Sequence, residues 1–398
     1  MADLIQKALS VIAALTLMAT GCTGGKTDTD IGGESQTSED TTMTLSRKTF
    51  AADEQHVKML GRTHTEDGIL WLPHSASGVE FTMTGTSASV TLAADSYCAQ
   101  EAKRPRFAAY VNGERVVDEM LSQSEQSLEI FTYEQEQEVT VRLIKLSEAA
   151  ESTCGIISID VTSVGDIAPT PEKDLKIEFI GDSITCGYGV DDEDRDHHFS
   201  TSTEDATKAY AYKTAQLLDA DYSLVSYSGN GIISGYTTQG KQVKAQRVPM
   251  FYEELARSSG EYNGYCVSST PWDFSKFVPD VVVINLGTND ASYTGSDKDL
   301  QQEYTDAYAE FLKKVRKNNP DAQIVCVLGV MDNRLCDAMC AAAEKYTAET
   351  GDTKVSTLKL TMQDGNKNGY AADWHPTAAS HDIAAAETAE KIKSVLGI

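Results

Sequence analysis

The sequence predicts two folded domains of different classes, an all-β sandwich followed by an α/β domain with a parallel sheet. In the first part of the chain, short segments alternate apolar and polar residues, and no helical segment separates them. After the linker Ala168-Pro169-Thr170-Pro171, short continuous apolar runs alternate with longer helical segments. A chain of 398 residues is long enough for both cores. We therefore expect a β-sandwich at residues 45–166 and an α/β domain at residues 172–398.

The first 44 residues are expected to form an export signal and a tether. Residues 1–22 contain an apolar run, Val11–Met18, that is too short for a comfortable membrane span, and they end in Gly21-Cys22. This ending resembles the lipidation site of bacterial lipoproteins, in which Cys22 is the lipidated first residue of a surface or periplasmic protein. The alternative is a buried helix. Residues 23–44 are rich in Thr, Ser, Gly and acidic residues and have no aromatic residue, which predicts a flexible tether.

The expected strands of the β domain are short and joined by turn residues. Asn112-Gly113 is a hairpin signal, and Gly85-Thr86-Ser87 is expected to form a turn between two strands. The number and spacing of the strands predict a sandwich or jelly roll. Cys98 and Cys154 could pair in an oxidising compartment, but their positions do not settle the connectivity. The strands are expected at residues 78–84, 88–92, 106–111, 114–117, 138–146 and 155–161.

The α/β domain is predicted from apolar runs without alternation, which are typical of parallel strands buried on both faces. Their order along the chain predicts a doubly wound, flavodoxin-like sheet. The strands are expected at residues 177–180, 222–225, 281–284 and 324–328, and the helices at 209–218, 300–317, 338–349 and after His375.

Polar segments follow three of these strands, and a fourth lies near the end of the chain. Gly181-Asp182-Ser183 follows the first strand, Tyr227–Gly231 the second and Gly287–Asp290 the third, while Asp373-Trp374-His375 precedes the last helix. Open α/β sheets bind ligands at this edge. Each segment alone is explained equally well by a turn or a helix cap. Four such segments in this order favour a hydrolytic site.

A serine hydroxyl becomes a nucleophile when a neighbouring base accepts its proton and a third group orients that base. Ser183, His375 and Asp373 could supply these three functions if the fold brings them together.

The four segments together resemble the SGNH hydrolases, also called the GDSL family, over the whole second domain. Two stretches, Ile180–Gly189 and Pro271–Asp290, resemble carbohydrate esterase family 2 more closely, as does Gly61–Phe81 in the first domain. The resemblance implies a jelly-roll first domain and the removal of acetyl groups from plant polysaccharides of the xylan or glucomannan type. It also implies that no metal or other cofactor is needed.

The resemblance further implies that Ser183 is the nucleophile and His375 the base. The oxyanion hole then consists of the Ser183 N–H, Gly231 and Asn289, with Gly229 as the alternative to Gly231. The SGNH pattern usually has two residues between the aspartate and the histidine, whereas Asp373 and His375 have one. Either Asp373 or a backbone carbonyl therefore orients His375.

Aromatic residues near these segments are candidates for stacking on sugar rings, although any one of them could be a core residue. They are Trp272, Trp374, Tyr236 and Tyr293. Two acidic segments, Asp192–Asp196 and Asp364–Gly369, resemble parts of calcium loops but lack required positions, so we expect no calcium site.

The net charge of −26 disfavours nucleic acid and anionic membranes as partners and fits a neutral substrate such as an acetylated polysaccharide or oligosaccharide. A membrane contact is then expected only through a lipid at Cys22. Two other functions stay open: an esterase for another acyl group, such as peptidoglycan acetate or a lipid ester, and a glycan-binding surface protein whose serine site is idle.

Overall fold

The computed structural model describes residues 44–398. The predicted signal peptide, the lipidation at Cys22 and nearly all of the predicted tether lie outside these residues. Within residues 44–398, no helix combines the length and the apolar character needed to cross a bilayer.

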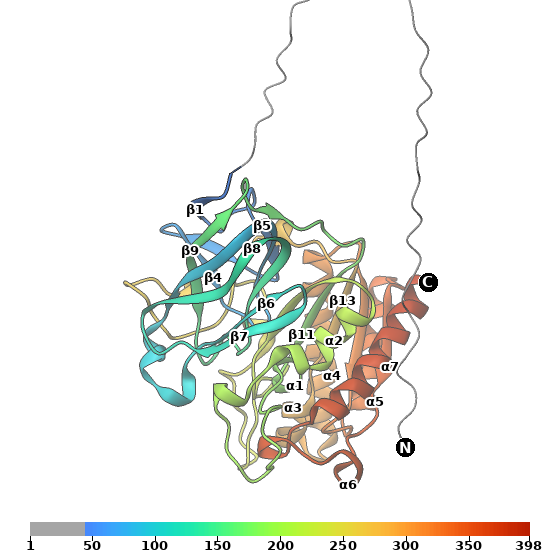
Figure 1. Ribbon diagram of the computed structural model, residues 1–398. Coiled ribbons are helices and arrows are strands. Elements are labelled where there is room, and N and C mark those ends of the chain that lie inside the picture. The colour runs from blue at the N-terminus through green and yellow to red at the C-terminus, as the bar shows by residue number, and fades with distance from the viewer. Residues whose placement is uncertain (1–43) are drawn as a thin grey trace, which may run out of the picture. The chain divides into compact units, whose positions relative to one another are not determined.

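The first domain is an antiparallel sheet of ten strands in which two long strands, β5 and β8, run through the centre (Figure 1). The central order is β3-β4-β9-β5-β8-β6-β7, while β1 pairs with β9, and β2 and β10 pair with β5. The strands are β1 (Ser46–Phe50), β2 (Lys58–Leu60), β3 (His64–Glu66), β4 (Ile69–Leu72), β5 (Gly78–Ala94), β6 (Arg106–Val111), β7 (Glu114–Met120), β8 (Glu125–Lys145), β9 (Cys154–Ser163) and β10 (Ala168–Pro169).

The predicted turn at Gly85-Thr86-Ser87 is wrong. β5 continues through these residues, and its pairing with β8 and β9 shifts register between Gly85 and Ser87. The glycine is needed for close approach, because a Cβ at Gly85 would lie 2.3 Å from the carbonyl oxygen of Thr162. A bulge, and not a turn, therefore separates the two halves of β5.

The core of the first domain contains residues from both halves of the long strands, such as Phe81 and Val141 from one half and Val90 and Ile130 from the other. Cys98 and Cys154 are both buried here as free thiols. The possible disulfide between them is therefore not formed in this structure.

The second domain contains a five-stranded parallel sheet in the order β12-β11-β13-β14-β15. Its strands are β11 (Lys176–Gly181), β12 (Asp221–Ser226), β13 (Val281–Asn285), β14 (Gln323–Leu328) and β15 (Val355–Lys359). The next strand in the sequence, β12, pairs with one edge of β11, and β13 pairs with the other edge. The strand order therefore reverses at β11. This reversal point is where doubly wound sheets bind their ligands. The predicted fold class is confirmed for both domains.

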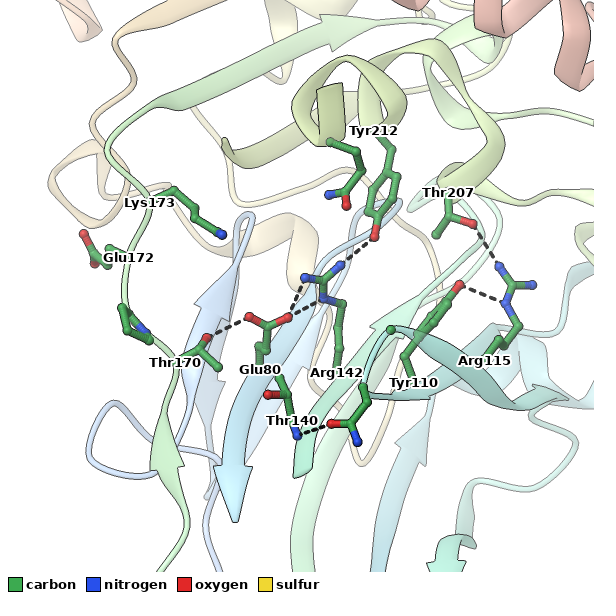
Figure 2. Close-up of a pocket in the computed structure, with 14 residues that line it drawn as sticks. Glu80, Tyr110, Arg115, Thr140, Arg142, Thr170, Glu172, Lys173, Thr207 and Tyr212 are labelled. Atoms are coloured by element: carbon green, nitrogen blue, oxygen red, sulfur yellow. Dashed lines mark hydrogen bonds and ion pairs between the residues drawn. The ribbon is translucent and has the colours of Figure 1, made fainter. Parts of the chain in front are cut away.

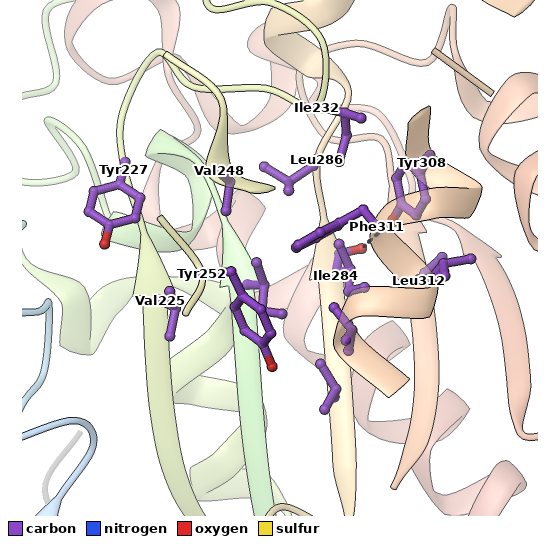
Figure 3. Close-up of a cluster of buried hydrophobic side chains, with 14 of the residues drawn as sticks. Val225, Tyr227, Ile232, Val248, Tyr252, Ile284, Leu286, Tyr308, Phe311 and Leu312 are labelled. Atoms are coloured by element: carbon purple, nitrogen blue, oxygen red, sulfur yellow. Dashed lines mark hydrogen bonds between the residues drawn. The ribbon is translucent and has the colours of Figure 1, made fainter. Parts of the chain in front are cut away.

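Helices cover both faces of this sheet. Alternate residues of β13 and β14 point to opposite faces: Ile284 and Ile324 pack with α4 and α5, whereas Val283 and Val325 pack with α2 and α7. Figure 3 shows the first of these clusters, with Tyr308, Phe311 and Leu312 of α4 lying against the strands. The helices are α1 (Ser183–Cys186), α2 (Tyr210–Leu217), α3 (Thr288–Thr294), α4 (Lys298–Asn318), α5 (Cys336–Thr350), α6 (Gly365–Asn368) and α7 (Ala378–Leu396).

Buried charged groups join the two domains. Arg62 of the β domain is fully buried, and its guanidinium lies 3.1 Å from the Glu178 carboxylate on β11. The same guanidinium donates to the carbonyl oxygen of Tyr252 at 2.7 Å. Because a buried charge is tolerated only when it is paired and hydrogen-bonded, these contacts fix how the domains pack.

Candidate active site

Ser183 lies at the reversal point of the sheet, directly after β11. The Asp182 carboxylate caps the following helix by accepting the N–H of Ile184 at 3.0 Å. Gly181 has to be a glycine, because a Cβ there would lie 2.0 Å from the hydroxyl oxygen of Thr185. The turn thus holds Ser183 at the carboxyl edge of the sheet, where 6% of its surface is exposed.

His375 comes from the other end of the domain and contacts the serine directly. Its Nε2 lies 2.9 Å from the Ser183 Oγ, and its Nδ1 lies 3.2 Å from the carbonyl oxygen of Ala372. A carbonyl oxygen only accepts, so Nδ1 carries the proton and Nε2 has a free lone pair. This tautomer is the one that can take the serine proton.

A strained turn brings the carbonyl of Ala372 under the imidazole. Asp373 and Trp374 are consecutive residues with left-handed backbones, at φ 49° and 66°. The turn is closed by the Ala371 N–H, which donates to the His375 carbonyl at 2.8 Å, and by the His375 N–H, which donates to the Ala372 carbonyl at 3.0 Å. Such strain at non-glycine residues is typical of functional sites.

Asp373 faces away from the Nδ1 of His375. Its carboxylate accepts the Tyr188 hydroxyl at 2.8 Å and the Phe199 N–H at 3.1 Å, and it lies 3.2 Å from the Nδ1 of His198. Because only one residue separates Asp373 from His375, the turn directs their side chains to different partners. Of the two orienting groups considered, the structure places the backbone carbonyl against the imidazole and not the carboxylate.

Tyr188 is a site residue that the sequence reasoning missed. Its ring stacks on the His375 imidazole, with centroids 4.0 Å apart, and Phe199 stacks on the Tyr188 ring at 4.1 Å. The Tyr188 hydroxyl is the group that binds Asp373, so the carboxylate supports the base through this ring. The position of Tyr188 between Gly187 and Gly189, within the motif that contains the serine, was the available signal.

Burial lowers the pKa of His375 to about 4, and the Ala372 carbonyl and the Asp373 charge oppose this shift. For Asp373, burial favours a higher pKa, but hydrogen bonds from Tyr188, His198 and the Phe199 N–H outweigh it, and the net pKa lies below the ordinary value. The site therefore holds a neutral imidazole beside an ionised carboxylate near neutral pH.

Asn289, on α3, lies beside the serine turn. Its Nδ2 donates to the Asn230 carbonyl at 2.9 Å and, with a longer bond of 3.2 Å, to the Asp182 carboxylate. The amide thus links the loops that follow β11 and β12. An oxyanion near Ser183 would share one of these N–H groups.

Gly231 does not offer its N–H to a ligand. That N–H donates to the Gln246 carbonyl at 3.2 Å. A Cβ at Gly231 would lie 2.3 Å from Asp290, whose carboxylate accepts the N–H groups of Ile232, Ile233 and Ser234, so the glycine is needed for this close approach. The preference for Gly231 as oxyanion donor is therefore corrected.

Gly229 is the better candidate of this loop. Its φ is 72°, and a Cβ there would meet nothing within 4 Å. Among the hydrogen bonds of residues 44–398, its N–H has no acceptor, while its carbonyl accepts the Tyr236 N–H at 2.8 Å. A free N–H on an open glycine suits an oxyanion hole.

The four aromatic candidates occupy different environments. Trp374 is 48% exposed beside the base, with the Arg195 guanidinium 4.1 Å from its ring centroid. Tyr236 is exposed, and Tyr293 is partly buried against the core. Trp272 is a core residue: it is 8% exposed, and the buried Arg62 lies 5.2 Å from its ring centroid. Trp272 also lines a cavity of about 420 Å³ together with Thr63 and Lys276, so its contact with a sugar stays a prediction.

The cavity of about 910 Å³ shown in Figure 2 lies between the two domains, and it is lined by none of the site residues discussed in this subsection. Its charged groups already have partners. Arg142 contacts Glu80 at 2.6 Å and the Tyr212 hydroxyl at 2.7 Å, and Thr170 donates to Glu80 at 2.8 Å. These contacts join the domains and leave few polar groups free to bind a ligand.

A serine nucleophile with a histidine base, placed at the reversal point of a flavodoxin-like sheet, defines a serine hydrolase. The chain belongs to the GDSL-like lipase/acylhydrolase family, whose model matches residues 179–383. The model of the carbohydrate esterase 2 N-terminal domain matches residues 59–171.

Individual relatives agree with this family. The chain is 32% identical over 327 residues to the cellulase/esterase CelE of Acetivibrio thermocellus; the match covers 81% of this chain and 37% of that protein. It is 26% identical over 360 residues to an acetylxylan esterase/glucomannan deacetylase of Cellvibrio japonicus, covering 88% of this chain and 92% of that protein. The structure of an acetyl xylan esterase, Est2A, from the rumen bacterium Butyrivibrio proteoclasticus superposes with a TM-score of 0.79 at 28% identity, covering 89% of this chain and 99% of that one.

Proposed function

We propose that this protein removes O-acetyl groups from plant polysaccharides of the xylan or glucomannan type through a serine acyl-enzyme. The observation that carries the proposal is the contact of 2.9 Å between the Ser183 Oγ and the unprotonated Nε2 of His375. No metal or other cofactor takes part in the proposed steps.

In the first step the Ser183 Oγ attacks the acetyl carbonyl carbon, and its proton passes to the Nε2 of His375. Negative charge develops on the carbonyl oxygen. The donors for it are the N–H groups of Ser183 and Gly229 and the amide of Asn289. The imidazolium then gives its proton to the departing sugar oxygen, so the C–O bond breaks and the sugar leaves as an alcohol.

In the second step a water molecule attacks the acetyl-serine, and His375 accepts one of its protons. The tetrahedral intermediate collapses, the serine oxygen takes the proton back from His375, and acetic acid leaves and loses its remaining proton to solvent to form acetate. The Nδ1 bond to the Ala372 carbonyl can persist throughout, because both protonation states of the imidazole keep that proton.

Three observations support a carbohydrate substrate. The first domain matches the N-terminal domain of carbohydrate esterase family 2, and the relatives named above include acetylxylan esterases. Trp374 presents an exposed indole one residue before the base, where a sugar ring could stack. The acidic net charge of −26 suits a neutral polymer. The apolar run before Gly21-Cys22 supports export, and lipidation of Cys22 belongs to the same proposal.

The test is acetate release from acetylated xylan, acetylated glucomannan and O-acetylated peptidoglycan, with the sugar products read by mass spectrometry. Ser183→Ala is the matched control. Release from xylan or glucomannan that the variant lacks supports the proposal. Release from peptidoglycan alone, or from a lipid ester alone, replaces the proposed substrate class with the alternative one.

A second candidate function is glycan binding without turnover, and the exposed Trp374 ring is the feature that favours it. In that case Ser183→Ala would bind deacetylated xylan or glucomannan as tightly as the wild type, while neither protein released acetate.

A further inference from the structure

The loop that contains Gly229 is contacted by a side chain from the first domain. The segment after β8 enters the second domain, where the Leu146 carbonyl accepts the Ala206 N–H at 3.2 Å. Glu148, in this segment, is fully buried. Its Oε2 accepts the N–H of Ser228 at 2.7 Å, and Ser228 directly precedes Gly229.

Glu148 belongs to a buried cluster that lies behind the nucleophile helix. Its backbone N–H donates to the Glu204 carboxylate at 2.9 Å, and acceptor atoms of Glu148, Glu204 and the Cys186 thiol lie within 4.8 Å of one another. One oxygen of Glu148 and one of Glu204 have no hydrogen-bond partner in residues 44–398. Both glutamate side chains are fully buried, so bulk water cannot form hydrogen bonds with these two oxygens.

The charges of the cluster can balance with a single shared proton. Lys145 is fully buried, and its ammonium donates to the backbone carbonyls of Ser147 and Glu148. Two carboxylates and one ammonium are neutral together when one carboxylate is protonated. Burial raises the pKa of Glu204 well above its ordinary value and that of Glu148 to about 7, with the Ser228 hydrogen bonds opposing the latter shift. We therefore assign the proton to Glu204 and the charge to Glu148, and the Lys145 ammonium supplies the positive charge that a bound cation would otherwise bring.

We propose that Glu148 is a positioning residue for the oxyanion hole: its carboxylate holds the Ser228 N–H and thereby fixes the Gly229 N–H relative to Ser183. Neighbouring residues of the loop are already fixed, because the Tyr227 N–H donates to the Gly181 carbonyl at 3.2 Å and the Asn230 carbonyl accepts the Asn289 amide at 2.9 Å. Glu148 holds Ser228, the first of the two residues between these anchors. The first domain thus completes the active site, an inference that rests on the proposed esterase function.

The kinetic test uses a small activated ester, 4-nitrophenyl acetate, so that polysaccharide binding does not enter. Glu148→Ala is expected to lower kcat about 10- to 100-fold with KM changed less than about twofold, because only the transition-state donor is displaced. Glu148→Gln keeps an acceptor of the same shape, and we expect it to retain kcat within about fivefold. Glu178→Gln is the control, since Glu178 is another buried glutamate, paired with Arg62 away from the loop. A fall in kcat for the control equal to that of Glu148→Ala would overturn the proposal.

The pH dependence gives a second reading. Protonation of Glu148 removes the charge that strengthens the Ser228 bond, so kcat of the wild type is expected to fall by a shallow step, about two- to fivefold, as the pH drops through about 7. The titratable groups whose charges interact with that of Glu148 are Lys145, Glu151, Glu204, Cys186, Asp182 and Tyr188. Burial raises the pKa of Asp182 to about 7 as well, so the comparison with Glu148→Gln is needed to separate the two carboxyl groups. Glu148→Gln should lack this step. A step that persists in Glu148→Gln assigns the titration elsewhere and contradicts the proposal.

Amide hydrogen exchange of peptides that contain residues 227–231, read by mass spectrometry, tests the loop without reference to activity. Faster exchange is expected in Glu148→Ala and not in Glu178→Gln. Unchanged exchange, or faster exchange with unchanged kcat, overturns the positioning role. Turnover that survives in Ser183→Ala contradicts the esterase proposal instead, and the exchange result then still reports whether Glu148 holds the loop. If Glu148→Ala does not fold, Glu148→Gln carries the pH test, and its outcome decides the proposal.

Discussion

The Nδ1 of His375 lies 3.2 Å from the carbonyl oxygen of Ala372, three residues earlier in the same turn. This carbonyl takes the position that a carboxylate holds in Ser-His-Asp triads. It fixes the tautomer as a carboxylate does, but it brings no full charge to stabilise the imidazolium. The base therefore depends on the backbone geometry of one strained turn and on the Tyr188 ring that stacks on it.

Ser183→Ala should abolish ester hydrolysis while the protein stays folded, because the change removes one oxygen from a turn that Asp182 and Gly181 hold in place. The expected loss in kcat is of order 10⁴-fold or more. Hydrolysis of 4-nitrophenyl acetate measures it, with circular dichroism as the check on folding. Wild-type turnover by the pure variant would refute the mechanism.

Asp373→Asn should cost about tenfold or less in kcat/KM, because the carboxylate contacts Tyr188 and the Phe199 N–H and not the imidazole. His375→Ala is the matched comparison and should be as damaging as the loss of Ser183. If Asp373→Asn instead approached the roughly 10⁴-fold loss of a triad aspartate, Asp373 would have to reach the imidazole during the reaction.

The pH profile of kcat/KM should fall on the acid side with an apparent pKa near 4, the value to which burial lowers the pKa of His375. Below that pH the imidazole is protonated and cannot accept the serine proton. The Asp373 charge raises the pKa of His375, so Asp373→Asn should move this limb to lower pH. A continuous loss of activity below the ordinary histidine pKa of about 6.5, larger than the shallow step assigned to Glu148, would show that the ring is more solvated than its position indicates.

Asn289→Ala should lower kcat about 10²–10³-fold and change KM little, because the amide is needed when charge develops on the acyl oxygen. The amide also links Asp182 to the Asn230 carbonyl, so the thermal midpoint is measured alongside the rate. A change confined to KM would reassign Asn289 to substrate binding.

Trp374→Ala should raise KM for acetylated xylo-oligosaccharides several-fold and leave hydrolysis of 4-nitrophenyl acetate within about threefold, since the exposed ring offers stacking surface to a sugar only. Trp272→Ala should instead lower the thermal midpoint, because it removes a core side chain. Equal losses of Trp374→Ala on both substrates would point to damage to the His375 turn.

The sequence predicts best the strands that are surrounded by core residues on both faces. β11, β12, β13 and β14 are buried on both faces and therefore appear as continuous apolar runs. β15 was missed because this edge strand is only partly buried and contains Ser356 and Thr357. At Gly85 the sequence does not distinguish a turn from a bulge, since both use glycine. The bulge is explained only by the neighbouring strand β9, whose Thr162 carbonyl leaves no room for a Cβ.

The same limit applies to the site. The motifs predict Ser183 and His375, because each follows a recognisable pattern, and the structure brings the two side chains together. Spacing alone could not choose between Gly229 and Gly231, because the choice depends on whether the Gln246 carbonyl occupies an N–H. Glu148 had no local signal at all, since it lies 80 residues before the serine whose N–H it accepts and belongs to the other domain.

The turn that presents Trp374 also restricts how this site can evolve. Its φ of 66° is readily adopted by glycine, asparagine and aspartate and costs other residues energy, so random substitution favours small polar side chains at this position. Those replacements relieve the strain but discard the stacking surface, and they loosen the backbone that carries the Ala372 carbonyl to His375. A lineage that changes the proposed sugar contact at Trp374 therefore risks its proton transfer in the same step. Tyr236 is exposed in the loop after β12 and has an ordinary backbone, so substitutions there are better tolerated.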